Sequence, residues 1–158
     1  MLHILCGNAE EDTTSVLDTS KDRKALSWVV PKKARIGDQV LFHLPVHGFV
    51  ARGVIGAEPQ FESKGRFIAK VQDIALLPIF VPLAFIRENH PDWKWPTYPR
   101  SYTTVDKAIE EKLDELVSSY QGVLNDPVLL AEGTATYIQT TTFERNPLAR
   151  RKCEPWQP

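Results

Sequence analysis

Apolar and polar positions alternate along several short segments of the chain, which is the spacing of half-buried β-strands. Leu2–Cys6 is a short apolar segment, and Trp28–Val30 is a second one that ends at a proline. Gln39–Leu44 and Gly48–Gly56 are rich in β-forming residues and are joined by a short turn, so we expect a hairpin. Gly65–Leu77 alternates throughout and predicts a long strand.

Other segments have helical spacing. Thr104–Tyr120 carries one apolar stripe, with Thr104 placed to cap it and Gly122 placed to end it. Val81–Asn89 has a proline in its first turn and predicts a short helix. Ser15–Leu26 predicts either a weak short helix or an irregular connection.

The remaining segments are less regular. Gly7–Thr14 is polar and predicts a loop, whereas Val128–Thr142 is rich in β-branched residues and predicts extended chain. Four or five strands, one long helix and one or two short helices favour an α+β domain built on a curved sheet or β-barrel with flanking helices. We expect the long helix to cover one opening of that barrel.

Composition limits the functions to consider. A chain of 158 residues with 42% hydrophobic content suits one globular domain, and its net charge of −1 means that nucleic-acid binding would depend on local patches. No segment has the length of a transmembrane helix or the form of a signal peptide, so we expect no membrane partner and a cytoplasmic location. Cys6 and Cys153 form no CxxC pair, which predicts free thiols, and Cys6 in an apolar strand is expected to be inert.

His90–Tyr102, the aromatic–proline segment, combines four aromatic residues with three prolines. Flat side chains on a stiff backbone suit stacking on a base or enclosing a methylated group. If the segment is extended, Trp93 and Trp95 point to opposite sides, so only one of them faces any pocket. The alternative is that these aromatics plug a barrel end or pack beneath the long helix.

Charged residues offer further chemistry. The basic cluster Lys21–Arg35, and Arg100 with Ser101 beside the aromatics, are candidates for phosphate contacts; the alternative for the cluster is a solvated surface. The histidines are His3, His43, His47 and His90. Their spacing does not suit a metal site, so we expect no metal and no cofactor. No nucleophile motif or glycine-rich phosphate loop is present, and we predict no catalytic residue.

Trp28 ahead of the Gly37-Asp38 turn, followed by the glycine-containing strand Gly48–Gly56, resembles the opening of an EVE-type domain of the PUA-like superfamily. Such domains are small β-barrels that hold a flipped or single-stranded nucleobase in an aromatic pocket. The resemblance implies that Asp38 forms a turn and is not a catalyst. The implied base-binding residues are Trp28, Phe42, Trp93, Trp95, Tyr98 and Tyr102. The implied phosphate or DNA contacts are Lys32, Lys33, Arg35, Arg100 and Ser101.

Phe143–Pro147, followed by Ala149-Arg150 and Cys153, resembles the linker before the HNH nuclease module of modification-dependent restriction endonucleases, and Glu132-Gly133 fits the same pattern. In those enzymes a PUA-like reader recruits the nuclease to DNA that contains 5-methylcytosine or 5-hydroxymethylcytosine. The resemblance implies a reader domain over residues 1–142 and a basic tail over 143–158. Only EPWQP follows Cys153, so we expect either an excised reader domain or a protein without its nuclease; this chain cannot cut DNA by the HNH mechanism.

The expected function is the binding of double-stranded DNA with a modified cytosine that is flipped into an aromatic pocket, with the nuclease domain normally in the same chain. Three alternatives stay open. One is a PUA-like RNA-binding module. The second is a small enzyme acting on a nucleobase or nucleotide, for which the titratable candidates are His43, His47, Asp73 and His90. The third is an interaction module with no nucleic-acid role, which the near-neutral charge favours.

Overall fold

The computed structural model describes residues 1–8, 10–22 and 25–125. The chain divides into two compact units, Met1–Val117 and Ser118–Pro158. The predicted boundary at residue 142, the extended segment 128–142 and the basic tail 143–158 lie outside the described residues. The described strands, and α3 as far as Val117, belong to the first unit.

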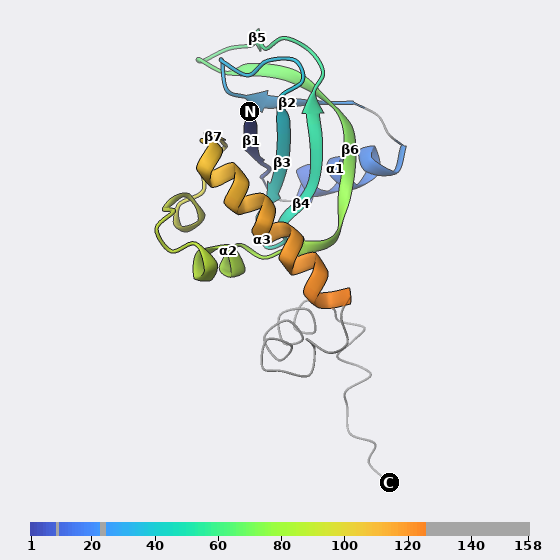
Figure 1. Cartoon of the computed structure of the whole chain (residues 1–158). Coiled ribbons are helices and arrows are strands. Elements are labelled where there is room, and N and C mark those ends of the chain that lie inside the picture. The colour runs from blue at the N-terminus through green and yellow to red at the C-terminus, as the bar shows by residue number, and fades with distance from the viewer. Residues whose placement is uncertain (9, 23–24, 126–158) are drawn as a thin grey trace. The chain divides into compact units, whose positions relative to one another are not determined.

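Seven strands of the described chain form one sheet (Figure 1). The strands are β1 (Leu2–Cys6), β2 (Leu26–Val30), β3 (Gln39–Leu44), β4 (Gly48–Ile55), β5 (Gln60–Phe61), β6 (Phe67–Val81) and β7 (Tyr102–Val105). The helices are α1 (Glu10–Asp22), α2 (Leu83–Asn89), the short 3₁₀ turn η1 (Trp95–Thr97) and α3 (Lys107–Asn125). The strands predicted within the described residues and the predicted hairpin of β3 and β4 are therefore confirmed, whereas β5 and β7 were not predicted.

The sheet curls into a half-barrel. Its strand order is β2-β6-β4-β3-β1-β7, with β5 on β6, and β1 lies parallel to β3 while the other adjacent strands are antiparallel. Irregular register between β4 and β6 marks bulges, which bend strands and increase their twist. As a result β1 and β2, four places apart in the order, approach each other. The expected α+β fold with a curved sheet is confirmed.

The concave face of the sheet holds the apolar core. Trp28 of β2 packs edge-on against Phe42 of β3, with ring centroids 5.1 Å apart, and Leu5 of β1 joins the same cluster. Val16 adds α1 to this core, so α1 covers the concave side against β2 and β6. Residues from most of the sheet converge here because the curl turns one face of each strand inward.

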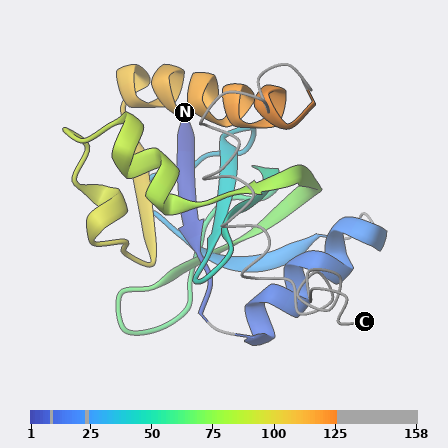
Figure 2. The ribbon, with the colours of Figure 1, turned by 90° about the horizontal axis from the view of Figure 1, so that it is seen from below.

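The convex face carries α3 (Figure 2). Arg52 of β4 donates a hydrogen bond to Asp114 of α3 at 2.7 Å, and Arg52 lies opposite Leu41, on the face away from Phe42. In Figure 2, α3 and α1 lie on opposite sides of the sheet. The prediction that the long helix covers a barrel opening is therefore wrong: the part of α3 that belongs to the first unit, as far as Val117, lies across the outside of the sheet.

Several element boundaries differ from the prediction, and those of α1 and α3 show why. Helix α1 begins at Glu10, inside the predicted loop, because three carboxylates in its first turn favour the positive end of the helix dipole. Thr104 is not a cap, since it lies in β7, and Asp106 instead accepts a hydrogen bond from the Ile109 N–H at 2.9 Å. Helix α3 continues past Gly122 to Asn125.

Candidate nucleic-acid interface

The aromatic–proline segment folds into consecutive turns after α2. The Trp93 N–H donates to the His90 carbonyl at 3.2 Å, and the Tyr98 N–H donates to the Trp95 carbonyl at 3.0 Å. The backbone is therefore not extended, so the condition under which Trp93 and Trp95 were expected to point to opposite sides is not met. Their rings stack at 5.3 Å with an interplanar angle of 20°.

The stack continues onto the convex face of the sheet. Trp95 lies nearly parallel to Phe49 of β4, with centroids 6.0 Å apart, and meets His43 of β3 edge-on at 5.6 Å. His90 lies 6.1 Å from Trp93. Both tryptophans are half-buried, so the stack is anchored on the sheet and still reaches solvent.

Two buried polar atoms in this stack have no hydrogen-bond partner among the described residues: His43 Nδ1 and Trp95 Nε1. Burial lowers the pKa of His43 to about 4, so the imidazole is neutral at pH 7. An unpaired buried polar group costs about 1–3 kcal/mol, and such groups call for an explanation such as a bound ligand or water. A neutral imidazole and an indole N–H together can offer an acceptor and a donor.

Beyond the stack, the segment presents polar and aromatic side chains to solvent. Tyr98 is 78% exposed, and Tyr102 at the start of β7 is 36% exposed. Arg100 and Ser101 are exposed between them. These residues place ring faces and hydrogen-bond donors on one short stretch of chain.

The six aromatic residues predicted to bind a base lie on two sides of the sheet. Trp28 and Phe42 are sealed in the concave core, where Phe42 has no exposed surface. Trp95 packs on the convex face through His43, the neighbour of Phe42 in β3 whose side chain points the other way. The structure thus pairs Trp28 with Phe42 on one face and Trp93 with Trp95 on the other. Tyr102 lies opposite the core residue Leu5 and so belongs to neither pair, and the base-binding role of all six residues stays a prediction.

The predicted phosphate contacts are also divided. Lys32, Lys33 and Arg35 are exposed in the loop after β2, near the end of the sheet that carries β5. In Figure 1, β5 lies at the top of the molecule and α2, which leads into the aromatic–proline segment, lies lower down. The side chain of Lys21 and residues 23–24 lie outside the described part of the chain.

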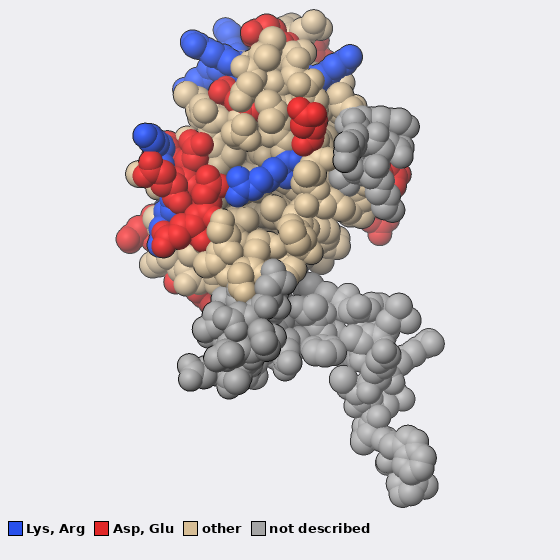
Figure 3. All heavy atoms as spheres, turned by 45° about the vertical axis from the view of Figure 1, so that its right-hand side comes forward, with Lys and Arg blue, Asp and Glu red and all other residues tan. Residues whose placement is uncertain are grey.

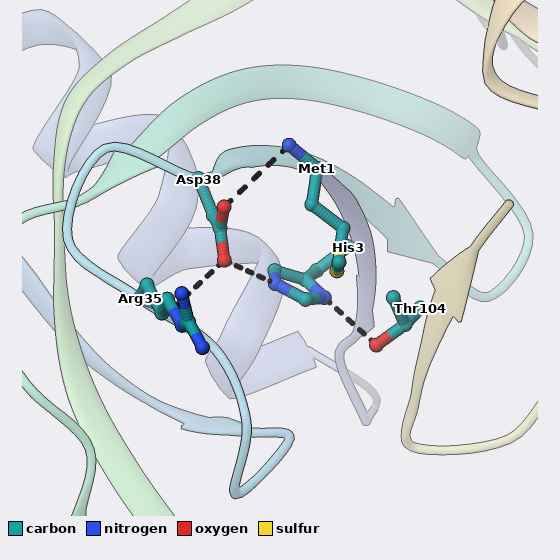
Figure 4. Close-up of polar contacts among 5 residues, drawn as sticks. All are labelled: Met1, His3, Arg35, Asp38 and Thr104. Atoms are coloured by element: carbon teal, nitrogen blue, oxygen red, sulfur yellow. Dashed lines mark hydrogen bonds and ion pairs between the residues drawn. The ribbon is translucent and has the colours of Figure 1, made fainter. Parts of the chain in front are cut away.

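A buried histidine links two strands and a turn through side-chain hydrogen bonds (Figure 4). His3 has no exposed surface; its Nε2 lies 2.9 Å from Asp38 Oδ2, and its Nδ1 lies 2.9 Å from the Thr104 hydroxyl. Asp38 Oδ2 also accepts a hydrogen bond from the backbone N–H of Arg35 at 2.8 Å. Burial would raise the pKa of Asp38, but the hydrogen bonds from His3 and Arg35 and the nearby positive charges lower it overall. We refer to His3, Asp38 and Thr104 as the histidine clamp.

The histidine clamp ties β1, the turn before β3, and β7 together. Its donor–acceptor order resembles a catalytic hydroxyl–imidazole–carboxylate series, but the ring of His3 is completely enclosed. A satisfied, enclosed imidazole is typical of a structural cross-link. Sequence reasoning missed this contact and the contact of His43 and Phe49 with Trp95, because each joins residues far apart in the chain.

Other candidate chemistry is limited. Burial raises the pKa of the Cys6 thiol to about 12, which keeps it protonated at pH 7. In the described ranges, no three His, Cys, Asp or Glu side chains gather as a metal site would require. Among the described helices, none combines the length and apolar character needed to cross a membrane.

The fold occurs in solved proteins of very different sequence. Rpa0253 from Rhodopseudomonas palustris is 12% identical with a TM-score of 0.56, over 74% of this chain and 92% of that chain. Atu2648 from Agrobacterium tumefaciens is 18% identical with a TM-score of 0.51, over 80% of this chain and 96% of that chain. A ZmASCH mutant protein from Zymomonas mobilis is 13% identical over 73% of this chain and 97% of that chain; its TM-score of 0.49 is too low to support an argument.

No protein-family model and no curated protein matches the sequence. At these low identities, the two structural similarities above a TM-score of 0.5 show a shared fold. The curled half-barrel sheet with its flanking helices agrees with the α+β fold expected from the sequence, and membership of the PUA-like superfamily stays a prediction. The EVE-type subclass and the relation to HNH endonucleases stay predictions.

Proposed function

We propose that this chain binds nucleic acid through the aromatic–proline segment, and that its ligand is double-stranded DNA carrying 5-methylcytosine or 5-hydroxymethylcytosine. The modified base leaves the duplex and stacks beside Trp93 and Trp95. In this proposal the chain is the specificity module of a modification-dependent restriction endonuclease, and cleavage belongs to a separate nuclease domain.

The observation that carries the proposal is the half-exposed Trp93–Trp95 stack with Tyr98 and Arg100 open to solvent beside it. Ring faces stack on bases of any sequence, and Arg donates to base edges or phosphates. The unpaired Nε1 of Trp95 supports the same proposal, because an ordered ligand at the stack could complete it.

The energetics require both stacking and charge contacts. Extruding a base costs a few kcal/mol, and stacking on an aromatic side chain returns about 1–3 kcal/mol per base. Net affinity must therefore come largely from phosphate contacts by residues such as Arg100. A methyl-sized contact contributes only about 1–3 kcal/mol, so we expect selectivity of roughly tenfold to 150-fold and not an absolute preference.

The test is an anisotropy titration of three labelled duplexes that differ only in one cytosine: unmodified, 5-methyl or 5-hydroxymethyl. We expect tighter binding of one or both modified duplexes. Equal affinity for all three would overturn the modification-specific part, and no binding would overturn the proposal. An RNA of the same sequence serves as competitor, and stronger binding of the RNA would redirect the proposal to RNA.

Two variants connect binding to the proposed surface. Tyr98→Ala and Arg100→Gln are both expected to weaken the preferred duplex, with little effect on folding because both side chains are exposed. Lys107→Gln is the matched control, since it removes one exposed positive charge from α3. If all three variants bind like the parent protein, the aromatic–proline segment is not the interface.

A further inference from the structure

We infer that a second surface binds an unpaired stretch of nucleic acid beside the duplex; this inference rests on the proposed function. The surface is formed by the hairpin of β5 and β6 together with the loop after β2. We call it the hairpin surface and define it by Lys32, Phe61, Lys64, Arg66 and Phe67.

An anchored but exposed aromatic ring is the first feature of the hairpin surface. Phe61 and Phe67 are directly opposite each other in β5 and β6, and their rings meet edge-on at 5.7 Å. Phe67 is half-buried against the concave core, whereas Phe61 is 64% exposed. An exposed ring held by a packed neighbour is a suitable platform for stacking an unpaired base.

A positive charge is held beside this platform. The ammonium of Lys32 lies 5.6 Å from the centre of the Phe67 ring, a cation–π distance that localises an otherwise mobile side chain. Lys64 and Arg66 are exposed in the turn of the same hairpin, where Glu62 is the nearby carboxylate. Figure 3 shows Lys and Arg side chains at the upper end of the molecule, with some Asp and Glu side chains between them; this is the end where β5 lies in Figure 1.

The turn between β5 and β6 has a defined backbone. The Glu62 N–H donates to the Arg66 carbonyl at 3.0 Å, and the Arg66 N–H donates to the Ser63 carbonyl at 2.8 Å. Lys64 and Gly65 both have positive φ, at 49° and 75°, which closes the turn tightly. The cations therefore extend from a hydrogen-bonded turn next to the rings.

This combination matches unpaired nucleic acid. A base offers a free ring face for Phe61 only when it is not stacked in a duplex, and its phosphates can meet Lys32 and Arg66. The chain as a whole has a net charge of −1, so this local excess of positive charge is not a property of the entire surface. The hairpin surface also lies away from α2 and the segment that follows it, so it would make a separate contact (Figure 1).

The experiment compares a blunt methylcytosine duplex with the same duplex carrying a single-stranded oligothymidylate overhang, and uses labelled oligothymidylate alone as a third probe. We expect the overhang to tighten binding about tenfold, which is the effect of roughly one stacked base. Phe61→Ala should abolish this gain and leave the affinity for the blunt duplex unchanged. Phe61→Leu, which keeps an apolar side chain without a flat ring, should also lose most of the gain.

Charge variants test the phosphate contacts. Lys32→Gln and Arg66→Gln should each reduce the salt dependence of overhang binding, by about 0.7 in the slope of log K against log salt for each phosphate lost. Lys107→Gln on α3 should leave the slope unchanged. Unchanged slopes in both Lys32→Gln and Arg66→Gln would overturn the assignment of these residues.

The outcomes separate this inference from the proposed function. Binding of the blunt duplex with no gain from the overhang overturns the inference and leaves the proposed function standing. Binding of oligothymidylate that depends on Phe61, without binding of the blunt duplex, supports the hairpin surface and overturns the proposed function. No binding of any probe overturns both.

Discussion

The two faces of the sheet use aromatic side chains in opposite ways. On the concave face, Trp28 and Phe42 pack edge-on among apolar neighbours and are sealed from solvent. On the convex face, Trp95 stacks between Phe49 and the half-exposed Trp93, and its indole nitrogen has no partner among the described residues. Apolar packing suffices to explain the first arrangement but leaves the unpaired polar atoms of the second unexplained.

This contrast shows that the position of an aromatic residue in the sheet, and not its sequence context, decides whether it is a core residue or an accessible one. Residues on the concave face are core residues, and their substitution should reduce stability. The exposed residues that follow Trp95, such as Tyr98 and Arg100, are accessible, so their substitution should change binding more than stability. The following predictions test that division, from the largest expected effect to the smallest.

Phe42→Ala should cause the largest loss of stability, about 3–5 kcal/mol, because it opens a cavity in a core that excludes water. Urea unfolding followed by tryptophan fluorescence measures it. Phe61→Ala is the control, since this ring is exposed and should cost less than about 1 kcal/mol. Equal losses would show that Phe42 is not part of a tightly packed core.

Acidification should lower the free energy of unfolding because His43 is buried in its neutral form. The pKa of His43 falls from 6.5 to about 4 on folding, so between these pH values the unfolded chain binds a proton that the folded chain does not. The free energy of unfolding is therefore unaffected by His43 above pH 6.5 and decreases as the pH falls from 6.5 towards 4. The loss should be on the order of 3 kcal/mol. His43→Phe should flatten the pH dependence of the urea midpoint over this range.

The pH test has a matched control in His47, which lies at the β3–β4 turn and is only half-buried. His47→Phe makes the same change of side chain, so a flattening that is specific to His43→Phe identifies His43 as the group responsible. An unchanged slope in His43→Phe would mean that His43 is not the group responsible. If His43→Phe weakens binding of the preferred duplex and also makes the protein more stable, the unpaired nitrogen of His43 contributes to ligand binding.

Asp38→Asn should destabilise the protein by about 1–3 kcal/mol, because the buried ring of His3 loses a charged hydrogen-bond acceptor. Thermal unfolding measures the change. Asp73→Asn is the control: Asp73 is exposed with φ of 53°, a conformation that Asn tolerates well, so stability should not fall. A loss no greater than the control's would contradict the importance of the histidine clamp.

Tyr98→Ala should have the smallest effect on stability, within about 0.5 kcal/mol, because most of the ring is already in water. Its effect on binding the preferred duplex should exceed its effect on folding, at about 1–3 kcal/mol. Urea unfolding and anisotropy titration on the same sample give both values. A large loss of stability without a change in binding would place Tyr98 with the concave core and not with the interface.

Local sequence patterns were sufficient for most of the elements. A short apolar run located β1 and period-two spacing located β3, and the turn between β3 and β4 was recognisable from its proline and glycine. Gly48 shows why that glycine is needed: its φ is 82°, and a Cβ atom there would lie 2.1 Å from the Val81 carbonyl oxygen. The predicted starts of α1 and α3 were wrong because hydrophobic spacing does not set them. Carboxylates in the first turn favour the start of α1 at Glu10, and the pairing of β7 and the Asp106 hydrogen bond set the start of α3.

The composition of the aromatic–proline segment was readable from the chain, but the direction of its side chains was not. Trp93 and Trp95 were expected to point to opposite sides if the segment was extended, and consecutive backbone turns instead stack them. Strand alternation puts Phe42 and the adjacent His43 on opposite faces, but which of the two faces is enclosed depends on the direction in which the sheet curls.

Spacing along the chain thus determined the strands, the helices and the kinds of side chain available for binding, because these depend on the backbone preferences and polarity of neighbouring residues. Long-range packing alone decided that His3 would meet Asp38 and Thr104, and that Trp95 would lie on Phe49. Those contacts join residues 35 or more positions apart, and they form only when the whole sheet curls to bury its apolar face.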